Sequence, residues 1–294
     1  MFEYDVVIMG AGIGGMTASI YLKRANIKCL VIEKDAPGGE LNRIGKIENY
    51  PGFDSIMGVD LAYNIYNQSE KLGCEYLFER VKEIDSLQRV IKTDRKIIKY
   101  KYLIMATGRR PKGLGLKDED KLVGRGISYC AICDGGLYRD REVIVIGGGN
   151  SAISEALYLA NICKKVTIIH RSSELRGNLG KEELDRNNIE IIYNKKVEEY
   201  VREEDKIKGV RLDDGSFIKG EGIFLAVGSI PNSDLIDVDK DKGYIIVDRK
   251  CMSSNKYIYA IGDVIKKDIY QLTTASGEGS IAASEIINNL SIKN

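Results

Sequence analysis

The 294-residue sequence has no tryptophan, only four prolines and a single histidine, His170. It also lacks any run of about 18 apolar residues, the length that a membrane-spanning helix needs, so we expect no membrane segment. Its 44 basic and 43 acidic residues give a net charge of +1, which argues against the broad basic surface of a nucleic-acid-binding protein. The first residues do not resemble a secretion signal, and six cysteines in such a chain favour a reducing cytoplasm.

Two of the cysteines, Cys130 and Cys133, are separated by two residues and are followed directly by Asp134. A structural zinc site needs four ligands, usually from a second such pair or from two histidines. We therefore interpret this pair as a redox-active dithiol, rather than as half of a metal site or as an accidental spacing, and we expect no metal. The remaining cysteines are scattered singly and are expected to pack in the core as small hydrophobic residues: Cys29, Cys74, Cys163 and Cys251.

A glycine-rich motif near the N-terminus lies between two apolar runs. Residues 6–9 lead into a turn containing Gly10, Gly12 and Gly15, a helical pattern follows, and the next apolar run closes on Glu33. Strand, glycine turn, helix, strand and acid together form the context that a dinucleotide-binding fold requires. We therefore predict a nucleotide site here.

The same unit returns later in the chain. Residues 143–146 lead into Gly147, Gly149 and Ala152, and the following strand closes on His170. An offset of 137 positions relates Gly10 to Gly147 and also Glu33 to His170. Two units in register predict two nucleotide-binding domains.

Apolar segments that end in glycine also repeat, at residues 102–108, 222–228 and 258–262. This order predicts an α/β protein with two Rossmann-like, three-layer ββα domains, the second inserted in the first. The first domain is expected to comprise residues 1–110 and 232–294, and the second, which carries the dithiol, residues 111–231. The crossings at residues 113–115 and 229–232 are candidate hinges because glycine tolerates large dihedral changes.

The residue that closes the second strand of each unit indicates which nucleotide fits. Glu33 can accept hydrogen bonds from ribose hydroxyls, which suits the adenosine of FAD. His170, Arg171 and Arg176 occupy the corresponding region of the second unit, where arginine can pair with a 2′-phosphate. This pattern favours NADPH over NADH, the alternative being that both arginines are solvated surface charges.

Near the C-terminus, Asp263 follows a strand-end glycine, and a helix is expected to begin near Gly277. The start of that helix would face a flavin and stabilise negative charge on its reduced ring. Asp263 would then bond a ribityl or ribose hydroxyl, or, alternatively, it would only cap a helix.

Taken together, these motifs resemble those of the low-molecular-weight bacterial thioredoxin reductases over essentially the whole chain. Residues 48–52, 106–108, 130–135, 262–263 and 271–275 complete the resemblance. It implies that FAD is bound in the first domain by Gly10, Gly12, Gly14, Gly15, Glu33, Lys34, Gly39, Glu40, Leu41, Asn49, Val81, Ala106, Thr107, Gly108, Gly262, Asp263, Gln271, Leu272 and Thr273. It implies that NADPH is bound in the second domain by Gly147, Gly149, Asn150, Ser151, Ala152, His170, Arg171 and Arg176.

The resemblance also implies a mechanism. Electrons would pass from NADPH through FAD to a Cys130–Cys133 disulfide, and the dithiol would reduce thioredoxin by exchange. Asp134 would act as the acid–base group beside the cysteines. Such enzymes are expected to be homodimers whose two domains rotate during turnover.

The sequence departs from this family around the predicted NADPH site. Ser172 stands where the family has an arginine, Glu174 adds a negative charge, and segment 177–180 and Tyr270 also differ. Losing one charged hydrogen bond costs on the order of 1.5–3 kcal/mol, so NADPH, ferredoxin and NADH all stay open as electron donors. Two other functions are a non-enzymatic flavin redox sensor or carrier, against which Asp134 argues, and a flavin oxidase acting on a small dithiol.

Overall fold

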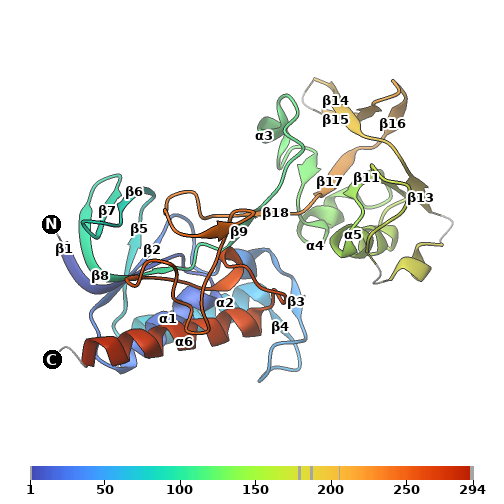
Figure 1. Ribbon diagram of the computed structural model, residues 1–294. Helices are drawn as coiled ribbons and strands as arrows, with labels where there is room; N and C mark the ends of the chain where they lie inside the picture. Colours follow the sequence, from blue (N-terminus) through green and yellow to red (C-terminus); the bar gives the residue numbers. More distant parts are fainter. Residues whose placement is uncertain (1, 178–179, 186–187, 205, 292–294) are drawn as a thin grey trace. The chain divides into compact units, whose positions relative to one another are not determined.

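The computed structural model describes residues 2–177, 180–185, 188–204 and 206–291. The chain forms two compact units, Met1–Arg110 with Pro231–Asn294, and Pro111–Ile230 (Figure 1). Pro231 therefore falls in the first unit, one residue from the predicted boundary. The two connecting segments, β9 (Arg109–Pro111) and β18 (Ser229–Pro231), pair as a two-stranded sheet. No helix of the described residues combines the length and apolar composition needed to cross a membrane.

The first unit is built on a seven-stranded sheet in which β1 pairs in parallel with both β2 and β8. In sheet order the strands are β5 (Glu75–Phe78), β2 (Cys29–Glu33), β1 (Phe2–Met9), β8 (Ile97–Met105), β7 (Val90–Thr93) and β6 (Val81–Asp85), with β21 (Ile258–Ala260) also on β8. Its helices are α1 (Ile13–Arg24), α2 (Gly58–Lys71) and α6 (Leu272–Ser291), and small elements are η1 (Gly39–Arg43), β3 (Lys46–Ile47), β4 (Ile56–Met57), β19 (Lys240–Asp241), β20 (Tyr244–Ile245) and η4 (Gly262–Val264).

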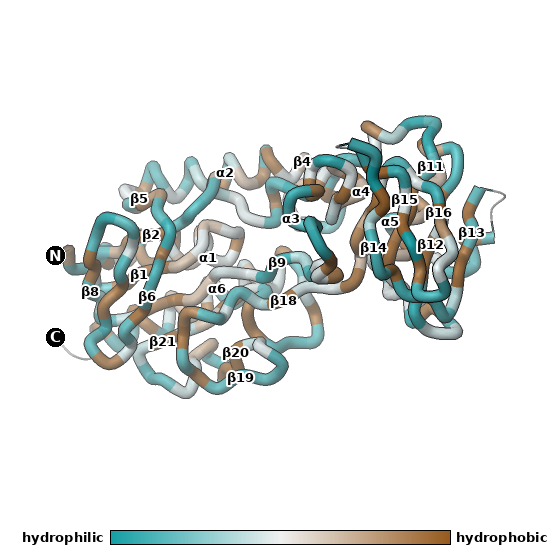
Figure 2. Tube along the Cα trace, turned by 90° about the horizontal axis from the view of Figure 1, so that it is seen from above, coloured by the Kyte–Doolittle hydropathy of each residue, from teal (hydrophilic) through white to brown (hydrophobic). Residues whose placement is uncertain are grey.

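Alternation along the central strands of this unit builds a core on each face of the sheet. Val6 and Ile8 of β1 face a cluster that includes Met16 of α1 and Ile286 of α6. Val7 points to the opposite face. It lies in a second cluster with Leu30 of β2, Leu103 of β8 and Ile91 of β7. Successive residues of a strand point to opposite faces, so two buried faces produce nearly continuous apolar runs. Figure 2 shows these runs as brown segments inside the unit.

The second unit has a five-stranded parallel sheet and a separate three-stranded antiparallel sheet. The parallel sheet contains β10 (Ile127–Ser128), β17 (Gly222–Ala226), β11 (Glu142–Gly147), β12 (Lys165–Ile169) and β13 (Ile189–Ile192) in that order, and the antiparallel sheet contains β14 (Val197–Glu203), β15 (Lys206–Leu212) and β16 (Phe217–Lys219). Its helices are α3 (Glu119–Leu122), α4 (Ala131–Asp134) and α5 (Asn150–Ala160), with the short η2 (Gly135–Tyr138) and η3 (Lys181–Leu184).

The parallel sheet of the second unit also has a core on each side. Val143 and Val145 of β11 pack against Ala156 and its neighbours on α5. Ile144, from the opposite face of β11, packs in a cluster with Val210 of the antiparallel sheet. Helix, parallel sheet and antiparallel sheet thus form three layers, which confirms the predicted fold class.

The start of the C-terminal helix differs from the prediction. Helix α6 begins at Leu272, five positions before Gly277, and the Ala275 N–H donates to the Gln271 carbonyl within its first turn. Gly279 is buried inside this helix because α6 lies very close to α1 there, whereas Gly277 is exposed. A Cβ atom added to Gly279 would be only 2.4 Å from the Gly14 carbonyl oxygen.

Candidate functional site

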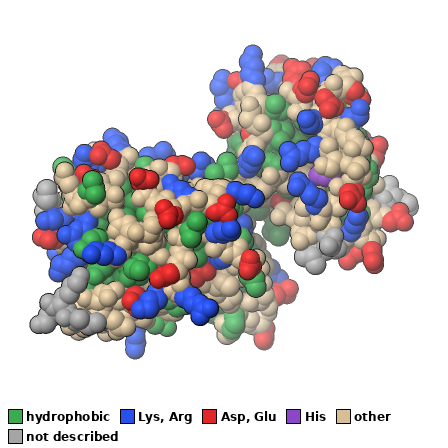
Figure 3. All heavy atoms as spheres, in the orientation of Figure 1, with side chains coloured by type: hydrophobic (Ala, Val, Ile, Leu, Met, Phe, Trp, Pro, Cys, Tyr) green, Lys and Arg blue, Asp and Glu red, His purple; other side chains and the backbone are tan. Residues whose placement is uncertain are grey.

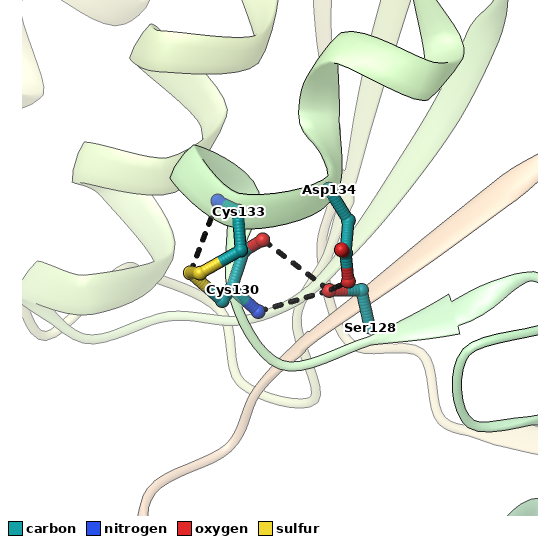
Figure 4. The surroundings of a disulfide bond; sticks show 4 residues. All are labelled: Ser128, Cys130, Cys133 and Asp134. Carbon is teal, nitrogen blue, oxygen red and sulfur yellow. Dashed lines mark hydrogen bonds between the residues drawn. A yellow bond between two sulfur atoms is a disulfide. The ribbon is translucent and has the colours of Figure 1, made fainter. Parts of the chain in front are cut away.

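The predicted dithiol is a disulfide, Cys130–Cys133, at the start of α4 in the second unit (Figure 4). Cys130 is half-buried and Cys133 is exposed. The Cys133 N–H donates to Cys130 Sγ over 3.1 Å. A sulfur that accepts such a bond is better able to carry the negative charge of a thiolate.

Asp134 is held beside the disulfide by Ser128, a residue that the sequence reasoning missed. The Ser128 hydroxyl donates to Asp134 Oδ2 over 2.7 Å, and the Cys130 N–H donates to Ser128 Oγ over 3.0 Å (Figure 4). Ser128 is buried, so it fixes the carboxylate relative to the cysteine backbone. A hydroxyl two positions before the dithiol was the available signal.

The first glycine turn, residues 10–15, joins β1 to α1. Gly10 has φ +104°, and a Cβ atom added there would lie 2.3 Å from the Ala106 carbonyl oxygen. A Cβ added to Gly12 would meet no atom within 4 Å, so the space in front of this residue is open. An open approach to the start of a helix is what a pyrophosphate requires.

Glu33 is oriented toward this turn. The Ala11 N–H donates to Glu33 Oε2 over 2.9 Å, and the Lys34 N–H donates to Glu33 Oε1 over 2.8 Å. The following segment also returns to the turn, because the Gly38 N–H donates to the Ala11 carbonyl over 2.8 Å. Gly39 therefore lies next to Gly12, where the absent side chain leaves room for a ligand.

Two residues predicted to contact the flavin lie close together although they are far apart in sequence. The Asn49 side-chain amide donates to Gln271 Oε1 over 3.2 Å. Both residues line a cavity of about 390 Å³ together with Ile44, Ile47 and Leu272. A cavity of this size is within the usual range for small-molecule sites.

Asp263 follows Gly262 in η4, just after β21, and is already paired. Arg109 Nε lies 3.0 Å from Asp263 Oδ2, and the Arg109 guanidinium stacks over the ring of Tyr270 at 4.7 Å. The Gly262 N–H donates to Glu278 Oε2, which also accepts from Lys267. Burial raises the pKa of Glu278, while Lys267 acts to lower it. This network fixes the turn that presents Asp263.

The other predicted flavin residues are more dispersed. Lys34 and Glu40 are exposed, whereas Leu41 is buried and packs near Ile13. Val81 begins β6 and packs against the core cluster that contains Val7. Thr107 Oγ1 donates to the Asn232 carbonyl over 2.7 Å, which ties the strand end to the returning chain. Gly14 contacts α6: a Cβ added there would lie 3.0 Å from the Ala275 carbonyl oxygen.

The second glycine turn, residues 147–152, joins β11 to α5 in the second unit. As at Gly12, a Cβ added to Gly149 would meet nothing within 4 Å. His170 is buried against Gly148, where an added Cβ would lie 2.2 Å from the imidazole Nδ1. Burial, followed by the nearby Arg176, lowers the pKa of His170. The imidazole therefore supports the turn as a neutral ring.

The predicted phosphate-binding arginines follow this histidine. Arg171 and Arg176 are both exposed, and the N–H groups of Arg176 and Gly177 donate to the Gly148 carbonyl over 2.7 and 3.0 Å. In Figure 3 the histidine appears in purple, with blue Lys and Arg side chains beside it. A Cβ added to Gly177 would lie 2.6 Å from the Asn150 nitrogen, so this segment crosses close to the start of α5. Asn178 and Leu179, in the segment predicted to be unusual, lie outside the described residues.

Among the described residues, no group of three or more His, Cys, Asp or Glu side chains is arranged to hold a metal ion. The four other cysteines are free thiols and are all buried, which confirms their predicted place in the core. The Cys130–Cys133 disulfide, with Cys133 exposed, is therefore the candidate redox centre of the second unit.

Comparisons with known proteins agree with this arrangement. A family model described as pyridine nucleotide-disulphide oxidoreductase matches residues 4–279. A thioredoxin reductase of Bacillus subtilis is 38% identical over 295 residues, which cover 96% of this chain and 93% of that protein. The crystal structure of Lactococcus lactis thioredoxin reductase superimposes with a TM-score of 0.86 at 36% identity, covering 97% and 98% of the two chains. A ferredoxin-flavin thioredoxin reductase of Clostridium acetobutylicum is also similar, with a TM-score of 0.57, 28% identity and 99% of each chain covered.

Proposed function

Because the chain belongs to the pyridine nucleotide-disulphide oxidoreductase family, we propose that it is an FAD-dependent thioredoxin-disulfide reductase. The observation that carries this proposal is the Cys130–Cys133 disulfide, with Cys133 exposed and Asp134 held beside it by Ser128. An exposed disulfide next to a fixed carboxylate suits exchange with a protein disulfide. Similarity to the thioredoxin reductases of Bacillus subtilis and Lactococcus lactis supports thioredoxin as the partner.

The first unit has the residues that FAD would need. Glu33 would bind the adenosine ribose, the open space at Gly12 would admit the pyrophosphate, and Asn49 and Gln271 line the cavity suited to the ring. Asp263 would bind a ribityl or ribose hydroxyl from the turn that Glu278 fixes. When bound, FAD supplies a carrier that accepts electrons from the donor and passes them to the disulfide.

The chain's own residues would handle the proton and the sulfur chemistry. Only a thiolate attacks a disulfide, so one reduced cysteine must lose its proton before it attacks thioredoxin. Asp134 would accept that proton, and the Ser128 hydroxyl keeps its Oδ2 in place. The thiolate then forms a mixed disulfide with thioredoxin, and the second cysteine displaces it to regenerate Cys130–Cys133 while thioredoxin leaves as a dithiol.

NADPH is the proposed electron donor, bound by the second unit. Support comes from the open space at Gly149 and from the exposed arginines Arg171 and Arg176, which suit a 2′-phosphate. The assignment of FAD to residues 1–110 and 232–294, and of NADPH to residues 111–231, is part of this proposal. So are rotation of the units, homodimer formation and a cytoplasmic location, the last of which suits a chain with four free thiols.

Ferredoxin is the second candidate donor. The observations that favour it are Ser172 in place of an arginine and the similarity to a ferredoxin-flavin thioredoxin reductase. The close approach of Gly177 to the start of α5 also narrows the proposed NADPH site. These observations weaken the nucleotide site without removing its glycine turn or its two arginines.

Anaerobic reduction of the flavin separates these donors. The purified FAD protein is mixed with excess NADPH, NADH or reduced ferredoxin, and the visible absorbance of the flavin is followed over time. We expect fast bleaching by NADPH, followed by turnover when oxidised thioredoxin is added. Bleaching by ferredoxin alone would replace the donor but keep the activity, whereas bleaching without thioredoxin turnover would overturn the reductase proposal in favour of a sensor or an oxidase.

A further inference from the structure

Two of the free cysteines lie against each other inside the first unit, far along the chain from the Cys130–Cys133 disulfide. Cys29 Sγ and Cys74 Sγ are 3.9 Å apart. Both residues are buried, with exposed fractions of 1% and 7%. No other cysteine lies near either of them in sequence, so their contact arises from the fold alone.

Strand register explains why the two sulfurs meet. Cys29 begins β2, and Cys74 directly precedes β5. The parallel pairing of Leu30 with Glu75 places the two cysteines side by side, one position earlier. Neighbouring strands lie about 4.8 Å apart, within the roughly 4.4–6.8 Å Cα separation that disulfides span. A disulfide here therefore requires the two sulfurs to move together with little change in the backbone.

The surroundings of Cys74 are polar for a buried thiol. Ser19 Oγ and Ser69 Oγ are 2.6 Å apart, and the Tyr76 hydroxyl donates to Ser69 Oγ over 2.8 Å. A hydrogen bond from Cys29 lowers the pKa of Cys74, burial opposes it, and the Ser69 and Ser19 hydroxyls add to the lowering. The pKa of Cys29 is raised, mainly by the same contact. The contact thus shifts the pKa values of the two thiols in opposite directions, and Cys74 Sγ also donates to the Glu75 carbonyl oxygen over 3.7 Å.

Within the described part of the chain, the other two free cysteines make no hydrogen bond with a second sulfur, and neither has a lowered pKa. Burial raises the pKa of Cys163 to about 11 and that of Cys251 to about 12. They are the matched internal controls, because they are buried to a similar extent in the same chain. A reaction that depends on a thiolate should pass them by.

We propose that Cys29 and Cys74 form a second oxidisable dithiol, which a hydroperoxide converts to a disulfide linking β2 to the residue before β5. The Cys74 thiolate would attack the peroxide, forming a sulfenic acid and releasing water or an alcohol once the leaving oxygen is protonated. The Cys29 thiol would then attack the sulfenic sulfur, forming the S–S bond and releasing water. Each cycle oxidises two thiols and reduces one peroxide.

This link would lie at the opposite end of β2 from the nucleotide-binding residues. Cys29 is the first residue of β2 and Glu33, which contacts the first glycine turn, is the last. We therefore expect the oxidised protein to keep its flavin. The inference does not depend on the identity of the electron donor or on thioredoxin as the partner.

The test uses FAD-loaded protein in which Cys130→Ser and Cys133→Ser together remove the first dithiol, so that only the four buried thiols remain. After hydrogen peroxide treatment and alkylation under denaturing conditions, non-reducing digestion and mass spectrometry identify linked peptides. We expect a Cys29–Cys74 peptide and a loss of two hydrogen atoms from the intact mass. We expect Cys163 and Cys251 to react at least about tenfold more slowly.

Two single replacements in that background identify the order of events. With Cys29→Ser, a sulfenic acid should persist on Cys74 and be trapped by dimedone, whereas with Cys74→Ser no dimedone adduct should appear on Cys29. Flavin absorbance reports whether each variant has folded, and the unreplaced pair provides the main result independently of them. Cys74 remaining a free thiol, or all four cysteines reacting at similar rates, would overturn the proposal.

Discussion

The two glycine turns of the molecule share a backbone plan and differ in the side chains around it. Gly12 in the first turn and Gly149 in the second open onto free space. In both units the segment after the next strand returns to the turn, where the Gly38 N–H donates to the Ala11 carbonyl and the Arg176 N–H donates to the Gly148 carbonyl. The strand-end residue differs. Glu33 accepts the Ala11 N–H in the first unit, whereas the buried neutral ring of His170 packs on the second turn.

This difference indicates how one architecture can serve two nucleotides. A carboxylate at the strand end offers an acceptor to ribose hydroxyls and repels a 2′-phosphate. The second turn replaces it with a neutral ring followed by Arg171 and Arg176, so its electrostatic preference is reversed. The returning segment also lies closer there, because Gly177 approaches the Asn150 nitrogen while Gly39 stays beside Gly12. The second site is therefore the narrower and the more easily lost.

Removing the dithiol should have the largest effect, because it should abolish the proposed activity of the second unit and leave flavin binding by the first unit intact. In Cys133→Ser and in Cys130→Ser, thioredoxin reduction should fall to background because neither single thiol can form the intramolecular disulfide. The flavin should stay bound, since its proposed residues lie in the first unit. Steady-state turnover and flavin content measure both effects in one preparation. Loss of flavin from either variant would contradict the assignment of FAD to that unit.

Replacing one glycine by alanine in each turn tests which unit binds FAD and which binds NADPH. Gly12 and Gly149 have backbone angles that alanine readily adopts, and both added methyl groups would enter open space, so neither replacement should disturb the fold. Each methyl would, however, enter the space proposed for a pyrophosphate. We expect Gly12→Ala to lose FAD, and Gly149→Ala to keep FAD while its bleaching by NADPH slows at least tenfold. Equal flavin loss in both would refute the division of ligands.

The sequence was sufficient to predict the elements whose signals lie in one contiguous stretch of the chain. The strand, glycine turn and strand-end residue are contiguous in each unit, so the offset of 137 positions carried the assignment from Glu33 to His170. The predicted start of α6 was wrong because Gly277 was interpreted as a helix boundary, whereas the helix continues through it to Gly279, where close packing on α1 leaves no room for a side chain. Contacts that depend on sheet register, such as Cys29 with Cys74, have no local signal.

Arg171→Ala should weaken the binding of NADPH more than the binding of NADH. Loss of one charged hydrogen bond to a 2′-phosphate corresponds to roughly a ten- to hundredfold rise in the Michaelis constant for NADPH. NADH has no such phosphate, so its constant should not change and serves as the control. The retained Arg176 should keep some preference for NADPH. An unchanged NADPH constant would mean that Arg171 is a solvated charge.

The smallest effect concerns a buried carboxyl that belongs to the second unit alone. Glu155 Oε2 on α5 is buried without a hydrogen-bond partner among the described residues, and burial raises the pKa of this group to about 7. Between pH 4.5 and 7 the native protein holds a proton that the unfolded chain has released. The contribution of Glu155 to the free energy of unfolding should therefore fall as the pH rises through this range, by on the order of 1 kcal/mol per pH unit, whereas the lowered pKa of His170 acts in the opposite direction. Glu155→Gln should flatten this slope, measured as the difference between the two proteins in denaturant unfolding. Glu155 contrasts in this respect with Glu278 of the first unit, which accepts a hydrogen bond from Lys267. Identical pH slopes for the wild-type protein and Glu155→Gln would show that Glu155 is ionised in the folded state.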